Sequence, residues 1–118
     1  MPDTKSETKN SEEDNEELRK KLQELKNQKG ILGYIVRDSQ SASIDLKDPT
    51  KIIDYALLSS TAFDIGCDMT ETLQMGELDN LVVESEETKL LFMNINDRRL
   101  NIFMEKNVDH NKLYTDLK

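Results

Sequence analysis

Residues 48–73 read DPTKIIDYALLSSTAFDIGCDMTETL, and this stretch decides the fold. Asp48 and Pro49 are residue types that helices favour as the N-cap and the first helical position. The helical pattern then continues to about Leu73, and Gly76 ends the segment. A helix of this length spans about 37 Å, which is long for a chain of 118 residues.

This predicted helix carries two apolar faces at helical spacing. The first face consists of Ile52, Ala56, Phe63 and Leu73, with Ser59 and Gly66 at points of close approach. The second face consists of Tyr55, Leu58, Ala62, Ile65 and Met69. One face is enough to pack on a small sheet, so we expect the second face to be covered by another protein chain.

Strands are predicted on both sides of the long helix. Residues 31–36 are apolar on both alternating faces, which predicts a strand inside the sheet, with Gly33 allowing a helix to approach closely. Residues 42–46 alternate apolar and polar side chains, which predicts a half-buried strand nearer an edge. After the helix, short turns separate three more predicted strands, at residues 78–84, 89–95 and 98–105.

Two shorter helices are predicted at the ends of the domain. The N-terminal helix shows a single apolar stripe, formed by Leu18, Leu22 and Leu25. The C-terminal helix starts near Asp109 and presents Leu113 and Leu117 on one side. Because both faces of the last two strands are partly apolar, we expect the long helix on one face of the sheet and the terminal helices on the other. This is an α+β architecture.

Charge is distributed unevenly along the chain. The net charge is -8, and residues 1–17 hold seven acidic residues against two lysines. We expect residues 1–13 to be a disordered acidic tail and residues 14–118 to form one domain. An acidic protein repels phosphate backbones and anionic lipid surfaces, which argues against nucleic-acid and membrane partners.

The cellular compartment follows by elimination. No apolar run approaches the roughly 20 residues that span a bilayer, and the N-terminus lacks the apolar core of a signal peptide. Cys67 is the only cysteine, so no intramolecular disulfide can form. We therefore expect a cytoplasmic protein without membrane insertion.

The search for catalytic, cofactor and metal motifs leaves few candidates. His110 is the only histidine, and it lies in a polar segment without a nucleophile or a second ligand nearby. The four glycines form no phosphate-binding loop. We therefore predict no catalytic residues, no cofactor and no metal, and a protein that is not an enzyme.

Charged residues near the long helix are candidates for contact with a partner. Asp64, Asp68 and Glu71 lie at i, i+4 and i+7, which predicts an acidic helix edge facing solvent or a protein, because a cation site needs more oxygen ligands. Arg98 and Arg99 begin the last strand. They are predicted to be solvated or paired with carboxylates such as Glu84 or Glu87, and a role as an arginine finger in trans is the lesser alternative.

Residues 16–118 resemble the Roadblock/dynein light chain family. The resemblance rests on the element order and on short motifs: ILGYIVRD at 31–38, the DP helix start at 48–49, and MGEL at 75–78 leading into LVVE at 81–84. The hairpin formed by residues 90–95 and 100–104 completes it. The family usually has a glycine in the first hairpin turn, where this chain has Ser39-Gln40-Ser41.

The resemblance implies a five-stranded antiparallel sheet between the long helix and the two terminal helices. It also implies homodimers or heterodimers with a paralogous chain, in which the long helices pair and the third strands join two sheets into one. Such dimers serve as platforms for small Ras-like GTPases, and some belong to dynein motors.

Our leading hypothesis is a non-enzymatic dimeric scaffold that binds and regulates a small Ras-like GTPase. The alternatives are an adaptor subunit of a motor or transport complex and a small-molecule-sensing domain. The predicted self-association surface consists of Tyr55, Leu58, Ala62, Ile65, Met69 and Val82.

Overall fold

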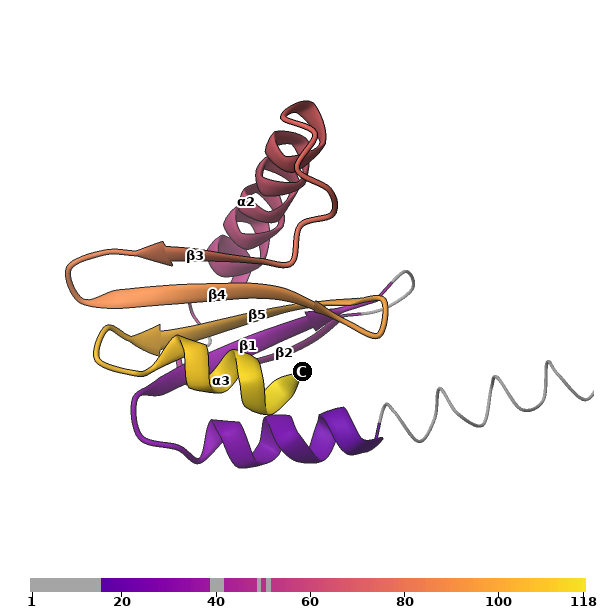
Figure 1. The fold of residues 1–118 in the computed structure, drawn as a ribbon. Coiled ribbons are helices and arrows are strands. Elements are labelled where there is room, and N and C mark those ends of the chain that lie inside the picture. The colour runs from indigo at the N-terminus through magenta and orange to yellow at the C-terminus, as the bar shows by residue number, and fades with distance from the viewer. Residues whose placement is uncertain (1–15, 39–41, 49, 51) are drawn as a thin grey trace, which may run out of the picture.

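The computed structural model describes residues 16–38, 42–48, 50 and 52–118. The N-terminal helix is described over residues 16–26, so the tail predicted over residues 1–13 and the Ser39-Gln40-Ser41 turn lie outside the described residues. The remaining elements are β1 (Ile31–Arg37), β2 (Ala42–Leu46), α2 (Ile52–Thr72), β3 (Asn80–Glu84), β4 (Thr88–Ile95), β5 (Arg98–Glu105) and α3 (His110–Leu117). Figure 1 shows them arranged as helices on both faces of one sheet.

The five strands form one antiparallel sheet in the order β2-β1-β5-β4-β3. As predicted, β1 lies inside the sheet, between β2 and β5, and β2 lies at an edge. The opposite edge is β3, which pairs with β4 alone. The structure thus confirms the predicted α+β architecture.

The N-terminal helix and α3 cover one face of the sheet. Leu18, Leu22 and Leu25 are 5%, 4% and 2% exposed, which confirms the predicted leucine stripe. These side chains share one buried cluster with Leu113 and Leu117 of α3 and with strand residues such as Leu91, Met93, Leu100 and Ile102. Burial of so many large aliphatic side chains is the main source of stability on this face.

The long helix α2 packs on the other face. Tyr55 stacks on Phe103 of β5 with ring centroids 4.7 Å apart, and Phe63 is only 2% exposed. Gly66 lies against β3 and the segment before it, since a Cβ atom there would come within 3.1 Å of Leu78 and 3.3 Å of Leu81. The predicted close approach at Gly66 is therefore present. The C-terminal half of α2 rises beyond the β3 edge of the sheet (Figure 1).

The ends of α2 differ slightly from the prediction. The predicted helix begins at Pro49 and ends at about Leu73, and α2 is observed over Ile52–Thr72. The Asp48 carboxylate still accepts hydrogen bonds from the backbone N–H and the hydroxyl of Thr50, as an N-cap residue does, and Pro49 lies outside the described residues. The left-handed residue that caps the end of α2 is Gln74, with a φ of 55°, rather than the predicted Gly76. The backbone N–H groups of Gln74 and Met75 donate to the carbonyl oxygens of Glu71 and Thr70.

Two assignments to the faces of α2 need correction. Tyr55 was predicted on the outer face, but its ring stacks on the sheet. Leu73 was predicted on the sheet-facing side, but it is 64% exposed. Leu73 follows the last residue of α2, at the end that has passed the edge of the sheet (Figure 1).

Gly33 allows the close approach of strand β2, and not of a helix as was predicted. A Cβ atom at Gly33 would lie 2.4 Å from the carbonyl oxygen of Asp45 and 2.8 Å from the Cα atom of Leu46, both in β2. The residue thus permits close contact between β1 and β2 at the point where the pairing of β1 with β5 shifts register.

Within the described residues, no helix has the length and apolar character needed to cross a bilayer.

Candidate interaction surface

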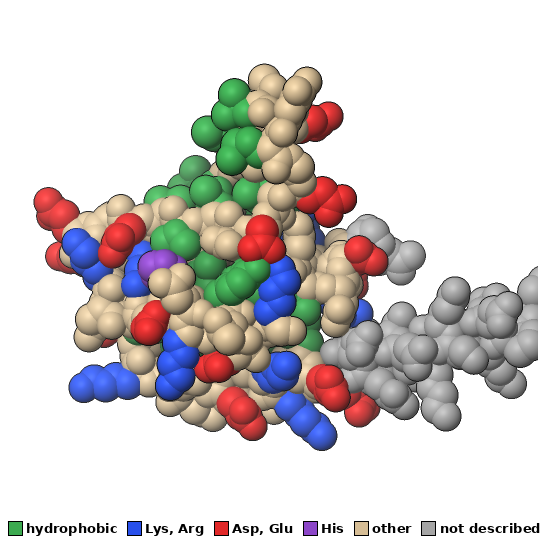
Figure 2. All heavy atoms as spheres, in the orientation of Figure 1, with side chains coloured by type: hydrophobic (Ala, Val, Ile, Leu, Met, Phe, Trp, Pro, Cys, Tyr) green, Lys and Arg blue, Asp and Glu red, His purple; other side chains and the backbone are tan. Residues whose placement is uncertain are grey.

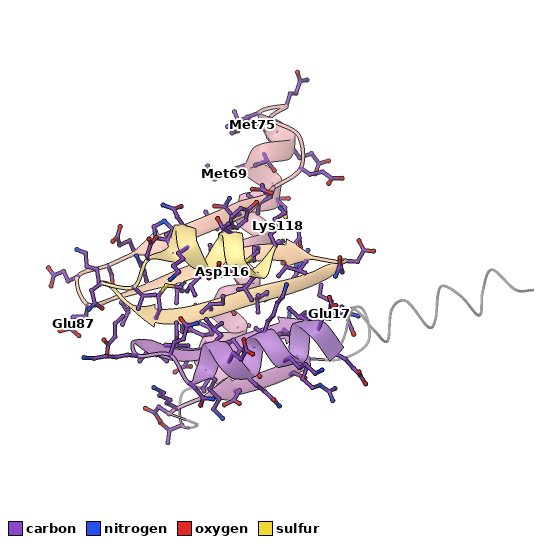
Figure 3. The ribbon with its side chains drawn as sticks, turned by 60° about the horizontal axis from the view of Figure 1, so that its bottom comes forward. Glu17, Met69, Met75, Glu87, Asp116 and Lys118 are labelled. Atoms are coloured by element: carbon purple, nitrogen blue, oxygen red, sulfur yellow. The ribbon has the colours of Figure 1, made fainter. Side chains whose placement is uncertain are left out.

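Large apolar side chains stand exposed along the outer flank of α2, on the segment after it and on β3. We call this set the apolar patch. Its members are Leu58 (65% exposed), Ile65 (55%), Met69 (57%), Leu73 (64%), Met75 (68%) and Val83 (44%). Figure 2 shows apolar side chains gathered at this end of the molecule, and Figure 3 shows Met69 and Met75 at the end of the helix distant from the sheet. Contiguous exposed apolar surface of this kind marks interaction sites.

The apolar patch continues from the helix onto the edge strand β3. Val83 of β3 is 44% exposed on the α2 side of the sheet. Val82, which was predicted for this surface, instead packs against the core under the terminal helices. Successive strand side chains point to opposite faces, so Val83 takes the position on the patch that had been assigned to Val82.

A cavity of about 200 Å³ lies beside the patch, between α2 and the sheet. Its walls include Leu32, Tyr55, Leu58, Val83, Leu90 and Phe103. Most of this lining is apolar, and Leu58 and Val83 belong to both the cavity and the patch. A cavity with such a lining suits an apolar side chain inserted by a partner.

The residues predicted for self-association are only partly brought together. Leu58, Ile65 and Met69 share the patch, and Ala62 lies half-buried on the same helix. Tyr55 contributes to the cavity wall while packing on Phe103. The predicted self-association surface did not include Leu73, Met75 or Val83, which the structure places on the patch.

The predicted acidic edge of α2 is partly neutralised by the sheet. Asp64 forms an ion pair with Arg99, with 2.9 Å between carboxylate oxygen and guanidinium nitrogen. The Arg99 guanidinium also lies 4.5 Å from the centre of the Phe63 ring. Asp68 and Glu71 are exposed, and the described residues contain no group of three or more side chains suited to hold a metal ion. Asp64 is thus the carboxylate partner of Arg99, in place of Glu84 or Glu87.

The two adjacent arginines of β5 serve different faces of the sheet. Arg99 points toward α2, as its ion pair shows. Arg98 lies on the opposite face, in the wall of a cavity beneath the N-terminal helix. The two predicted partner-contacting arginines therefore do not form one site.

A polar cluster attaches the start of β3 to α3. Asp79, in the segment before β3, accepts hydrogen bonds from the Lys118 ammonium at 2.5 Å, from the Asn80 amide at 3.0 Å and from the Tyr114 hydroxyl. The hydrogen bond from Lys118 is the main cause that lowers the pKa of Asp79 from 3.8 to about 2, followed by those from Tyr114 and Asn80. The cluster links the edge strand under the patch to the C-terminal helix.

Replacing Asp79 by asparagine should remove a pH-dependent part of the stability. The native carboxyl has a pKa below its ordinary value, so its contribution is present above about pH 4 and is lost as the pH falls toward 2. We expect wild-type protein to be the more stable form at pH 5, with the difference shrinking below pH 4 and vanishing as the pH falls through 2. Urea unfolding of both proteins at several pH values measures this, and a difference independent of pH would contradict the role of Asp79.

Comparison with solved structures identifies the fold. A Roadblock/LC7 domain from Streptomyces avermitilis has a similar structure, with a TM-score of 0.66 over 84% of this chain and 83% of that chain, at 16% sequence identity. No protein-family model and no curated protein matches the sequence. The chain thus adopts the Roadblock/LC7 fold, as the sequence resemblance implied.

Proposed function

We propose that this chain is a non-enzymatic scaffold that dimerises through the apolar patch and, as a dimer, binds and regulates a small Ras-like GTPase. The main observation that supports dimerisation is the exposed apolar patch. Five of its six side chains are more than half exposed in a single subunit. Exposing this much apolar surface to water is unfavourable, and burying it against a second subunit removes the cost.

The position of the patch favours a partner of the same fold. α2 crosses the edge strand β3 there, and Gly66 allows it close contact with Leu81 of β3 and with Leu78 of the segment before that strand. A second copy related by a two-fold axis can place its own α2 on the patch and its own β3 beside this one. Strand pairing would satisfy the backbone groups that β3 leaves open at the edge. A paralogous chain with the same patch would fit equally.

The GTPase part of the proposal is supported by the resemblance to the Roadblock/dynein light chain family and by the exposed carboxylates of α2. Asp68 and Glu71 remain without a partner among the described residues and lie on the same helix as the patch. A basic surface on a GTPase would be electrostatically complementary to them. An adaptor role in a motor or transport complex would use the same patch with different partners.

A binding experiment separates these two roles. We expect the purified chain, immobilised and exposed to native lysate with GTP or GDP, to retain a Ras-like GTPase that then binds the chain again when purified. Asp68→Lys with Glu71→Lys should weaken that binding about tenfold or more, because it places like charges at the contact. Retention of motor or transport subunits without a GTPase would favour the adaptor role.

A further inference from the structure

The face of the sheet opposite the apolar patch holds a second cavity, with a volume of about 230 Å³. It lies between the N-terminal helix and the ends of β1, β2 and β5. Its lining consists of Leu18, Arg19, Leu22, Tyr34, Val36, Asp38, Ser43 and Arg98. The leucines and Val36 give it an apolar floor, and the remaining side chains give it a polar wall.

The sheet register explains why polar groups converge at this place. Val36 is paired with Ser43 on one side and with Leu100 on the other, and Tyr34 is paired with Asp45 and Ile102. Side chains that are paired across neighbouring strands point to the same face of the sheet. Ser43 and Arg98 therefore lie on the same face as Tyr34 and Val36, under the first turns of the N-terminal helix. That helix adds Arg19 from above.

The guanidinium of Arg98 lacks a hydrogen-bond acceptor among the described residues. Its Nη1 atom is buried, and no described atom accepts a hydrogen bond from it. Among the described residues, neither Arg19 nor Arg98 forms an ion pair, whereas the nearby Lys26 is paired with Asp45 at 2.9 Å. A buried guanidinium nitrogen without an acceptor is costly, so a ligand that supplies an oxygen would be favoured there.

The charge and protonation of the cavity wall suit an anion. The two arginines outnumber the single carboxylate, Asp38, by one charge. Burial is the main cause that raises the pKa of Tyr34 above its ordinary value of 10.0, so its hydroxyl stays protonated at neutral pH and can donate a hydrogen bond. Guanidinium and hydroxyl donors around one cavity are typical of phosphate and carboxylate recognition.

We propose that this cavity binds a small molecule carrying a phosphate or carboxylate group, with Arg98 as the central donor and Arg19, Tyr34 and Ser43 as supporting donors. The site lies on the face away from the dimer patch, so it does not depend on the proposed function. The volume is below the range of drug-sized pockets, about 300–1,000 Å³, which restricts the ligand to a small metabolite or a single charged group.

Calorimetric titration with inorganic phosphate, and separately with propionate, tests the site, with chloride at matched ionic strength as the reference. We expect saturable binding of at least one probe by the wild-type protein, and the preferred probe identifies the anion class. Arg98→Met should weaken that binding about tenfold to a hundredfold, because it removes a charged hydrogen-bond donor.

Arg99→Met is the matched control. It removes the same charge from the adjacent residue, but on the α2 face of β5, and should bind the probe as the wild type does. If Arg98→Met fails to fold, Arg19→Met replaces it, since Arg19 is exposed on the N-terminal helix. Equal binding by the wild type and the folded cavity variant, or no binding of either probe above the chloride reference, would overturn the proposal.

Discussion

Leu58→Asp converts the proposed dimer into a monomer with the mass of one chain, 13.6 kDa. Leu58 is 65% exposed on α2 and also lines the apolar cavity next to Val83, so it lies where the α2 and β3 parts of the patch meet. Burying a carboxylate among apolar side chains without a partner is strongly unfavourable. We expect the dimer dissociation constant to rise at least about a hundredfold, as for interface residues packed in a desolvated pocket. Light scattering over a concentration series measures it.

Leu57→Asp is the matched control for this experiment. Leu57 is 66% exposed, so the same charge is introduced at equal exposure one position earlier on α2. It precedes Asp64 by seven residues, which places it on the flank that pairs with Arg99 rather than on the patch. We expect this variant to remain dimeric, and circular dichroism should show both variants folded. Dissociation of Leu57→Asp with an intact Leu58→Asp dimer would move the interface to the acidic flank.

Gly33→Ala should destabilise the fold by about 2–4 kcal/mol. The added Cβ atom would lie 2.4 Å from a backbone oxygen of β2, and neither strand can withdraw without losing its hydrogen bonds to the other. Gly33 also has a φ of 152°, which an alanine adopts only with strain. Urea unfolding monitored by circular dichroism gives the free-energy difference.

Gly76→Ala separates the steric clash from the backbone strain. Gly76 has a φ of 93°, but apart from its chain neighbours no atom of the described residues lies within 4 Å of the position of its Cβ. Only the left-handed conformation opposes that substitution, at about 1 kcal/mol. If Gly33→Ala costs no more than Gly76→Ala, β2 yields to the new methyl group and the contact between β1 and β2 is not rigid.

The features that depend on local periodicity could be predicted from the sequence. The leucine stripe at Leu18, Leu22 and Leu25 repeats at helical spacing and needs only a sheet to cover it, so its burial followed directly. The alternation in residues 42–46 likewise indicated a strand near an edge, and the structure confirms the strand and its place. The half-buried pattern predicted from the same alternation is wrong, because Ala42, Ser43 and Ile44 are all exposed.

Other features depend on how distant segments meet, and local patterns do not encode that. Val82 and Val83 are equally apolar, and only the placement of α2 decides which of them joins the patch. The Asp64–Arg99 and Asp79–Lys118 pairs join residues 35 and 39 positions apart. Several carboxylates could have served each cation, so the sequence left the choice open.

The confinement of the patch to one edge has a consequence for stoichiometry. The opposite edge, β2, exposes a single large aliphatic side chain, Ile44, at 37%. A two-fold pairing through α2 and β3 would bury the apolar patch of each copy. The β2 edges, which expose little apolar surface, would then lie at the two outer ends. We therefore expect the proposed dimer to be self-limiting, because a third subunit would find no second apolar patch to bind.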